Sequence, residues 1–428
     1  MSDPGPFGDD PFKGMPFFGD LAKMLSTQGP VSWEAAGQLA LSIASGGESE
    51  PNVDPMERIT LEQLARVAEL QVTAATGLNP SATGRGVTIL PVTRTQWVQH
   101  SLDAYKPLFE HLATSLTPDP NAAVEPIEND PFGSGDPGAW LAPLMAMIGP
   151  MMLGMTAGSM LGHLSRRSFG QYDLPVPRPE SDELLLVVAN LDEFGAEWSL
   201  PAEDLRLWVC LHELTHHAVL NVPHVRARLE RLLTDYVSSF DPDPGALESR
   251  LGDVDPTSGD ALSHFQNVMG DPEALLGAVR SPAQVELLPR LEALVAVIVG
   301  YVDHVMDQVG GRLIGSYEMV TEALRRRRVT ADESDRFVER LLGLELGQDQ
   351  YERGEAFIAG IVQRAGAEVL ERLWADEADL PTPAEITAPG LWLARIGVEF
   401  DLPADLEVPD DLSDLDDPGA PDDGAGTP

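Results

Sequence analysis

Hydrophobic residues recur at helical spacing along most of the chain. In the segment ERITLEQLARVAELQVTAATG, which begins at Glu57, apolar residues lie three to four positions apart, as they do on the buried face of an α-helix. The same spacing runs from Ser199 almost to Gly310 and returns from Glu318 to Trp374. We therefore predict that the fold is mainly α-helical.

Two short segments depart from this helical pattern. VTILPV, from Val87, reads as an extended piece that leads into a helix, and ELLLVVANL, from Glu183 to Leu191, is rich in the apolar residues of a short strand. We predict a small β element within the α fold.

Composition divides the chain into three parts. Residues 1–56 are rich in Gly, Pro and Asp and contain one amphipathic piece, Trp33 to Ala44, so we expect a partly ordered N-terminal arm that docks on the body. Residues 57–398 carry the helical pattern and are expected to form a single domain. Residues 399–428 are acidic and rich in Pro and Gly, which is typical of a disordered acidic tail.

The stretch from Trp140 to Leu164 is long and apolar enough to span a bilayer, with Gly154, Gly158 and Gly162 at small-xxx-small spacing. Pro150 in its middle favours another interpretation, in which two helical pieces are broken at the proline and buried in a helical core. We expect the buried helices rather than a membrane span.

Charge excludes one class of partner. The chain has 69 acidic and 28 basic residues, a formal net charge of −41, so nucleic acid and anionic membranes are not expected as partners. The basic run from Arg325 to Arg328 ends a predicted helix, where basic residues interact favourably with the helix dipole. We interpret it as a solvated helix end.

The chain contains a single cysteine, Cys210, so neither an intrachain disulfide nor a thiolate-rich metal site can form. The first 20 residues lack the basic and apolar regions of a secretory signal. We expect a cytoplasmic protein.

The segment from Trp198 to His224 contains the pattern HExxH, formed by His212, Glu213 and His216. Ser199 can cap a helix here, and two histidines one helical turn apart can bind one tetrahedral zinc ion. A glutamate next to the first histidine lies beside the metal, where it can act as a general base in hydrolysis. We predict Zn²⁺ at His212 and His216, with Glu213 as the catalytic residue.

Other polar residues near the motif are weaker candidates. His217 lies off the ligand face and is expected to pack against or orient the ligands. His224 does not fit the metzincin pattern, which requires a ligand at position 222, here Val222. Cys210 is expected to be a buried packing residue.

A catalytic zinc needs a third protein ligand. The helix predicted from Leu288 to Gly311 is almost wholly apolar until Asp303, His304 and Asp307. Asp303 is our predicted third ligand, with His304 as the competing candidate. A polar pair between helices, without metal, is the remaining interpretation.

The segments QYDLPVPR, LLLVVANL, EWSLPAEDLRLWVCLHELTHH, VGYVDHVMDQVG and QYERGEAFIAGIV occur in this order, and over roughly residues 57–396 the chain resembles the type 2 family of zincin-like metallopeptidases. The resemblance implies a mostly helical catalytic domain, zinc ligands at His212 and His216, and Glu213 as the catalytic glutamate. The resemblance also implies a difference: many relatives carry EGxxD or EGxxE where this chain reads VGYVD, so Val299 stands in place of a glutamate that could be a zinc ligand.

We therefore expect a zinc-dependent metallohydrolase that cleaves an amide bond of a peptide or protein substrate. The alternative is a non-catalytic binding or scaffolding protein on a degenerate zincin fold, and a third interpretation is a protein anchored in a membrane through residues 140–164.

Overall fold

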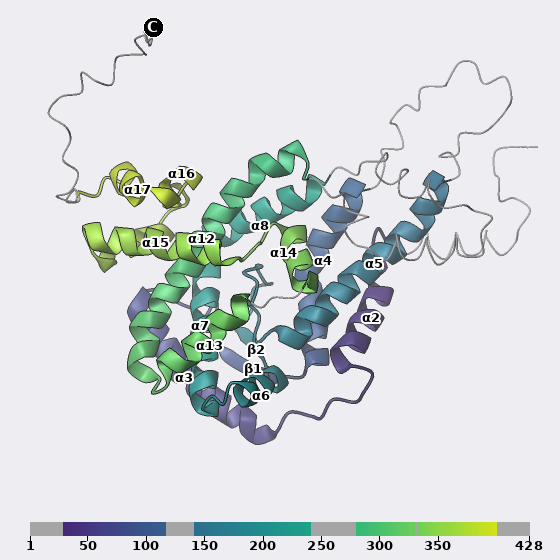
Figure 1. The fold of residues 1–428 in the computed structure, drawn as a ribbon, viewed down its shortest axis with the longest axis horizontal. Coiled ribbons are helices and arrows are strands. Elements are labelled where there is room, and N and C mark those ends of the chain that lie inside the picture. The colour runs from purple at the N-terminus through teal and green to yellow at the C-terminus, as the bar shows by residue number, and fades with distance from the viewer. Residues whose placement is uncertain (1–28, 117–140, 241–279, 330–332, 400–428) are drawn as a thin grey trace, which may run out of the picture.

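The computed structural model describes residues 29–116, 141–240, 280–329 and 333–399 (Figure 1). Helices dominate these residues, and the predicted fold class, mainly α with a small β element, is confirmed. The predicted acidic tail lies almost entirely outside the described residues, as do the first 28 residues of the predicted arm. In chain order the elements are α2 (Trp33–Ser45), α3 (Pro55–Thr76), β1 (Thr88–Val92), α4 (Arg94–Leu116), α5 (Leu141–Arg167), β2 (Glu183–Val187), α6 (Val188–Glu197), α7 (Ala202–Leu220), α8 (Pro223–Ser238), α12 (Pro282–Leu313), α13 (Tyr317–Val329), α14 (Glu333–Leu342), α15 (Gln348–Ala365), the 3₁₀ helices η1 (Ala367–Trp374) and η2 (Glu377–Asp379), α16 (Pro383–Thr387) and α17 (Pro389–Arg395).

The two strands form one parallel pair, with Thr88 opposite Glu183 and Val92 opposite Val187. The predicted extended segment at Val87 is thus confirmed as β1. The predicted strand from Glu183 to Leu191 is too long, because the chain turns into α6 at Val188. Asn190 and Leu191 are buried on that helix; an apolar run of this length does not distinguish a strand from a buried helix.

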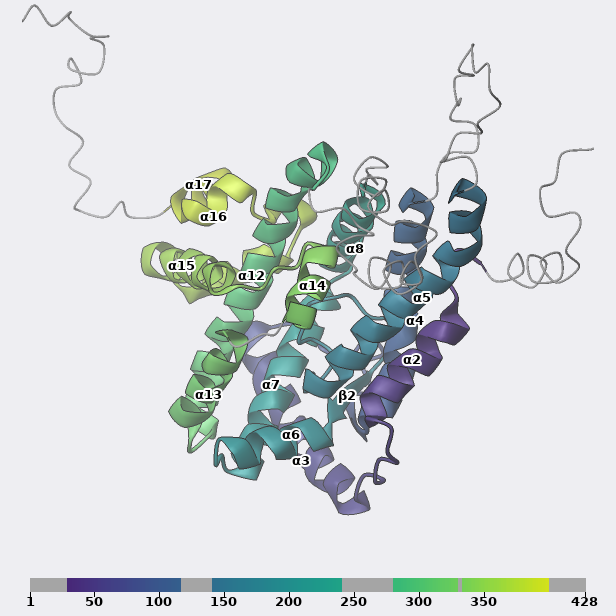
Figure 2. The same cartoon turned by 45° about the vertical axis from the view of Figure 1, so that its right-hand side comes forward.

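Helix α7 lies in the middle of the molecule and contacts α3, α6, α8, α12 and α13 (Figure 1 and Figure 2). Fourteen of its residues are buried, which explains why its sequence is apolar on nearly every side. Helix α12, whose first turn is fixed by a capping box between Ser281 and Gln284, passes beside α7 and crosses α15. At that crossing Gly300 and Gly354 face each other so closely that a Cβ on either would overlap the other helix.

Three glycines of α5 explain how the N-terminal region docks. Gly154, Gly158 and Gly162 lie one helical turn apart and face α2, and a Cβ built on Gly158 would lie 2.5 Å from the carbonyl oxygen of Ala36. Helix α2 lies along α5 in both views (Figure 1 and Figure 2). The small-xxx-small pattern therefore forms a helix–helix contact within the protein.

The sequence suggested that Pro150 breaks this segment into two helical pieces. The structure shows one unbroken helix instead. One helix spans Leu141–Arg167 with Pro150 inside it, and the Pro150 carbonyl accepts a hydrogen bond from the Ser32 amide at 2.8 Å. The backbone just before α2 is thus hydrogen-bonded to α5 at the proline. In the part of the chain that the structure describes, no helix is both long enough and apolar enough to cross a membrane.

Replacing Gly158 with alanine should separate α2 from α5. The added Cβ meets backbone atoms of Ala36, which cannot give way as a flexible side chain can, so we expect a loss of about 1–3 kcal/mol in the free energy of unfolding, the usual cost of overpacking. Gly149→Ala is the matched control, because nothing lies within 4 Å of a Cβ there and alanine favours the helix. Urea unfolding measures both; equal stabilities for the two variants would contradict this packing.

Candidate metal and catalytic site

The HExxH segment lies on α7, as predicted, but its helix does not begin as predicted. Helix α7 begins at Ala202, its N-cap residue is Pro201, and no side chain caps it. Ser199, the predicted cap, lies before the helix in a left-handed conformation with φ of 53°. Glu203 and Asp204 occupy the first turn, where acidic side chains interact favourably with the helix dipole.

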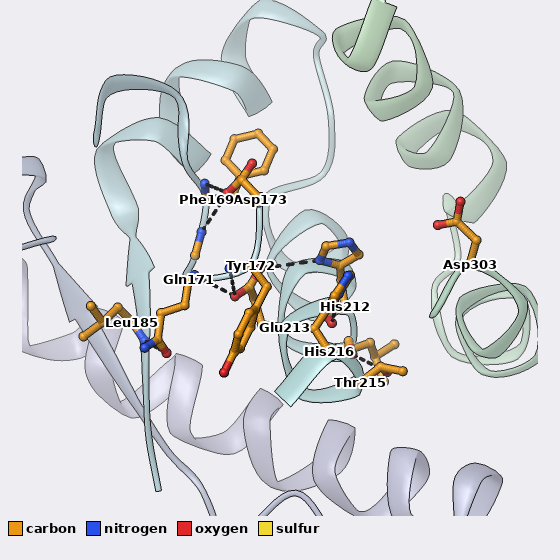
Figure 3. Close-up of polar contacts among 12 residues, drawn as sticks. Phe169, Gln171, Tyr172, Asp173, Leu185, His212, Glu213, Thr215, His216 and Asp303 are labelled. Atoms are coloured by element: carbon orange, nitrogen blue, oxygen red, sulfur yellow. Dashed lines mark hydrogen bonds and ion pairs between the residues drawn. The ribbon is translucent and has the colours of Figure 1, made fainter. Parts of the chain in front are cut away.

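His212 and His216 project from one face of α7, with their ring centroids 4.4 Å apart (Figure 3). The Nδ1 atom of His216 lies 3.2 Å from the carbonyl oxygen of His212. A proton on Nδ1 would donate to this oxygen and leave the lone pair on Nε2. Trp208 stacks on His212 at 4.9 Å and Tyr172 on His216 at 6.0 Å, so both imidazoles are held by aromatic rings.

Glu213 is almost completely buried, with 1% of its surface exposed. Its Oε2 atom accepts hydrogen bonds from the backbone amides of Gln171 at 2.7 Å and Tyr172 at 3.0 Å, while Oε1 lies 3.4 Å from Nδ1 of His212. Gly170 is necessary for this arrangement, because a Cβ at that position would overlap the Glu213 carboxyl group. The loop thus fixes one oxygen and leaves the other beside the first histidine.

Burial shifts the protonation of all three motif residues. It lowers the pKa of His212 to about 4, with a further contribution from the charge of Arg328, and the pKa of His216 to about 3, with a further contribution from His212. Burial, together with the nearby charge of Asp173, raises the pKa of Glu213 to about 7. At neutral pH both imidazoles are therefore uncharged, and the glutamate is poised between its two protonation states.

The three motif residues line a cavity with about 720 Å³ of empty space, part of it open solvent. Val299 of α12 also lines it, so position 299, where the sequence comparison led us to expect a glutamate, borders the same cavity as the two histidines. Here it presents a buried isopropyl group to the cavity.

Asp303 lies on the far side of α7 from the loop that carries Phe169 to Asp173 (Figure 3). Both of its carboxylate oxygens accept hydrogen bonds from Arg328 of α13, at 3.0 and 3.1 Å. Burial would raise the pKa of Asp303, but Arg328 outweighs burial and holds it below its ordinary value. The polar pair between helices that the sequence left open is thus present.

His304, the competing ligand, does not line the cavity that His212 and His216 line. Its Nε2 atom lies 2.8 Å from the side-chain amide nitrogen of Gln308, one turn along α12. The structure therefore does not bring His304 to the motif.

Several neighbours of the site were not predicted. Tyr172 connects two histidines, since its ring stacks on His216 and its hydroxyl lies 2.9 Å from Nδ1 of His217. His217 thus contacts Tyr172, and the role expected of it in orienting the ligands stays a prediction. Asp173 accepts hydrogen bonds from the amides of Phe169 and Gly170 and pairs with Arg327 at 3.3 Å. The shared segment QYDLPVPR, which includes Tyr172 and Asp173, was the available sequence signal.

The histidine pair fits a zinc ion in chemistry, because two neutral imidazoles on one helical face are the donors that zinc prefers. A zinc site also needs a third protein ligand. Among the described residues, no group of three or more His, Cys, Asp or Glu side chains is arranged to hold a metal ion. His212 and His216 are thus two well-oriented donors, and Asp303 is occupied by an arginine.

Glu213→Gln should change how stability depends on pH. The pKa of Glu213 rises from 4.5 to about 7 on folding, so the folded wild type binds an extra proton between these values and loses stability as pH rises through this window. A glutamine side chain does not ionise, so the variant does not lose stability in this way. The free energy of unfolding of the variant relative to wild type should increase between pH 5 and pH 8, by on the order of 3 kcal/mol.

Urea unfolding in the presence of a metal chelator measures this difference, and Glu34→Gln, at an exposed glutamate of α2, controls for the substitution itself. A difference between Glu213→Gln and wild type that stays constant over the pH range would mean that the carboxyl group ionises normally.

Comparison with known proteins identifies a similar fold and a family. A crystal structure from Chloroflexus aurantiacus, described as "a putative hydrolase with a novel fold", aligns with a TM-score of 0.55 and 24% identity, over 86% of this chain and 99% of that one. No curated protein matches the chain. The model of the zincin-like metallopeptidase family matches residues 31–393, and the chain therefore belongs to that family.

Proposed function

We propose that this protein is a zinc-dependent hydrolase that cleaves amide bonds in a peptide or protein substrate. One observation carries the proposal: the buried carboxylate of Glu213 is held between two backbone amides and a histidine, beside a second histidine on the same helical face. Family membership supports the hydrolase class. A cytoplasmic location is part of the proposal, because a chain with a single cysteine suits a reducing compartment.

Each residue has a distinct part in this proposal. Zinc, when bound, would polarise the scissile carbonyl and an attacking water molecule. His212 and His216 would hold the ion as neutral donors. The Oε1 atom of Glu213 would accept the proton of the water, and its pKa of about 7 suits a base that must also return the proton to the leaving amine.

The loop on the other side of Glu213 has a positioning part. With Oε2 held by the amides of Gln171 and Tyr172, the carboxyl group keeps its orientation while Oε1 exchanges a proton. The side chain of His212 is 14% exposed, so water reaches the site from the cavity.

A second candidate function has its own supporting observation. Because Arg328 takes both oxygens of Asp303 and the described residues hold no complete ligand set, a non-catalytic binding protein on a degenerate zincin fold is the alternative. The two proposals differ in whether the purified protein binds zinc through the motif.

Substitutions in the motif should separate zinc binding from catalysis. His212→Ala should lose bound zinc, because it removes one of the two neutral donors. Glu213→Gln should keep the zinc and lower kcat by about 10²- to 10⁴-fold, the usual contribution of a general base. Zinc content is measured by elemental analysis, and cleavage by mass spectrometry of a diverse peptide library.

His304→Ala is the matched control, since it removes a histidine that does not line the cavity; it should retain both zinc and cleavage. Wild-type protein that binds no zinc through His212 would leave the scaffolding alternative, and full activity in Glu213→Gln would remove the catalytic role of the glutamate.

Val299→Glu should strengthen zinc binding. The side chain at position 299 lines the cavity that the two histidines line, and a carboxylate there would add a third donor, with an effect of about tenfold or more on zinc affinity. Competition with a chromophoric chelator measures the affinity. Val299→Gln controls for size and polarity; if the glutamine variant binds zinc as tightly as the glutamate variant, position 299 does not reach the metal.

A further inference from the structure

Asp303 is held in place by an arginine that also reaches the histidine cavity. Arg328 donates to the two carboxylate oxygens of Asp303 at 3.0 and 3.1 Å, the bidentate geometry in which guanidinium and carboxylate bind most strongly. The side chains of this pair are 24% and 30% exposed, respectively. This is a largely buried ion pair, and it connects α13 to α12.

Arg328 is itself fixed by an aromatic ring. Its guanidinium carbon lies 4.0 Å from the ring centroid of Tyr351, on α15, within the range of a cation–π contact. The arginine therefore has two partners, Asp303 and Tyr351, that hold it in one position.

Arg328 and Trp208 are shared by the cavity of the two histidines and the cavity of Asp303. Both residues line the cavity of His212 and His216, and both also line a smaller neighbouring cavity that Asp303 lines. Asp303 follows Val299 by one helical turn, so the two share a face of α12, and Val299 lines the histidine cavity. Asp303 thus starts from the helical face that is directed at the motif.

A carboxylate bound on both oxygens by a guanidinium has little capacity left for a metal ion. The positive charge of Arg328 beside His212 also repels a divalent cation, an effect that is stronger in a partly buried site than in water. Removing this arginine would therefore favour metal binding in two ways: it would release Asp303, and it would remove a repelling positive charge. Experiment can separate these two effects.

We propose that Arg328 is a positioning residue that competes with the metal for Asp303, so that the metal site is completed only when Asp303 leaves Arg328 and turns toward His212 and His216. This inference rests on the proposed zinc site. The new element is that Arg328 sets the affinity of the site for zinc. This follows from the ion pair between Arg328 and Asp303, not from the HExxH motif.

The test compares two arginines with different partners. Arg328→Met releases Asp303, whereas Arg327→Met removes the same charge from the same cavity and releases Asp173. We expect the zinc affinity of Arg328→Met to be at least about tenfold higher than that of wild type, as for groups that orient metal ligands, and that of Arg327→Met to change much less. Equal increases in both variants would show a general charge effect and overturn the proposal.

A double substitution tests the part of Asp303 directly. In the Asp303→Asn background, Arg328→Met should give no increase beyond that of Arg327→Met, because the competing carboxylate is gone. Co²⁺ gives a second readout: the visible spectrum of the Co²⁺ protein should change between Arg328→Met and Arg328→Met/Asp303→Asn as one oxygen ligand is lost. Identical spectra and affinities in these two variants would mean that Asp303 is not a ligand.

Arg328→Lys guards against loss of folding, because it keeps the charge but not the bidentate geometry. Its zinc affinity should lie between those of wild type and Arg328→Met. A zinc affinity equal to that of wild type would contradict the competition. Adding His212→Ala distinguishes the two proposals. If zinc binding depends on His212 but not on Arg328, this inference fails and the zinc site stands. If zinc binding in every variant is independent of His212, both fail.

Discussion

The buried carboxylate of Glu213 is the group on which the arrangement of the site depends. A carboxyl group with 1% exposure needs hydrogen-bond donors, and it finds them in the backbone amides of Gln171 and Tyr172. The loop comes this close because residue 170 is a glycine. Two contacts hold the loop there: the Val187 amide donates to the Phe169 carbonyl, and the Trp97 indole donates to the Gly170 carbonyl. The small sheet and α4 therefore serve to position one side chain of α7.

Two arginines of α13 line the same cavity as this carboxylate, and each has an acidic partner. Arg327 pairs with Asp173 and lies 3.8 Å from the Phe169 ring centroid, while Arg328 pairs with Asp303. The run from Arg325 to Arg328 is thus more than the solvated helix end that the sequence suggested, since two of its residues point into the site. A largely buried carboxylate needs such a partner, because burial removes it from water.

The sequence predicted the features that depend on local pattern. The helical class, β1 and the helix of the HExxH motif follow from periodicity and spacing, and the structure has all three. It could not predict where the strand at Glu183 gives way to α6, because an apolar run fits either structure. The partner of Asp303 was also hidden: Arg328 is 25 residues away in the chain, and only the packing of α13 beside α12 brings them together. Spacing identifies groups on one helix, and it does not identify the groups that neighbouring helices present to them.

Val299 and Asp303 lie one helical turn apart on α12, and their different chemistry bears on the same site. A glutamate at position 299 would stand in the histidine cavity with a metal ion as its natural partner, whereas valine needs none. With valine there, Asp303 is the next acidic residue along this face of α12, and a buried carboxylate without a partner is costly. The two hydrogen bonds from Arg328 remove that cost. If zinc binds as proposed, the ion would have to offer Asp303 more than a bidentate guanidinium stacked on Tyr351 does, so the strength of the ion pair would help to set the affinity of the proposed site.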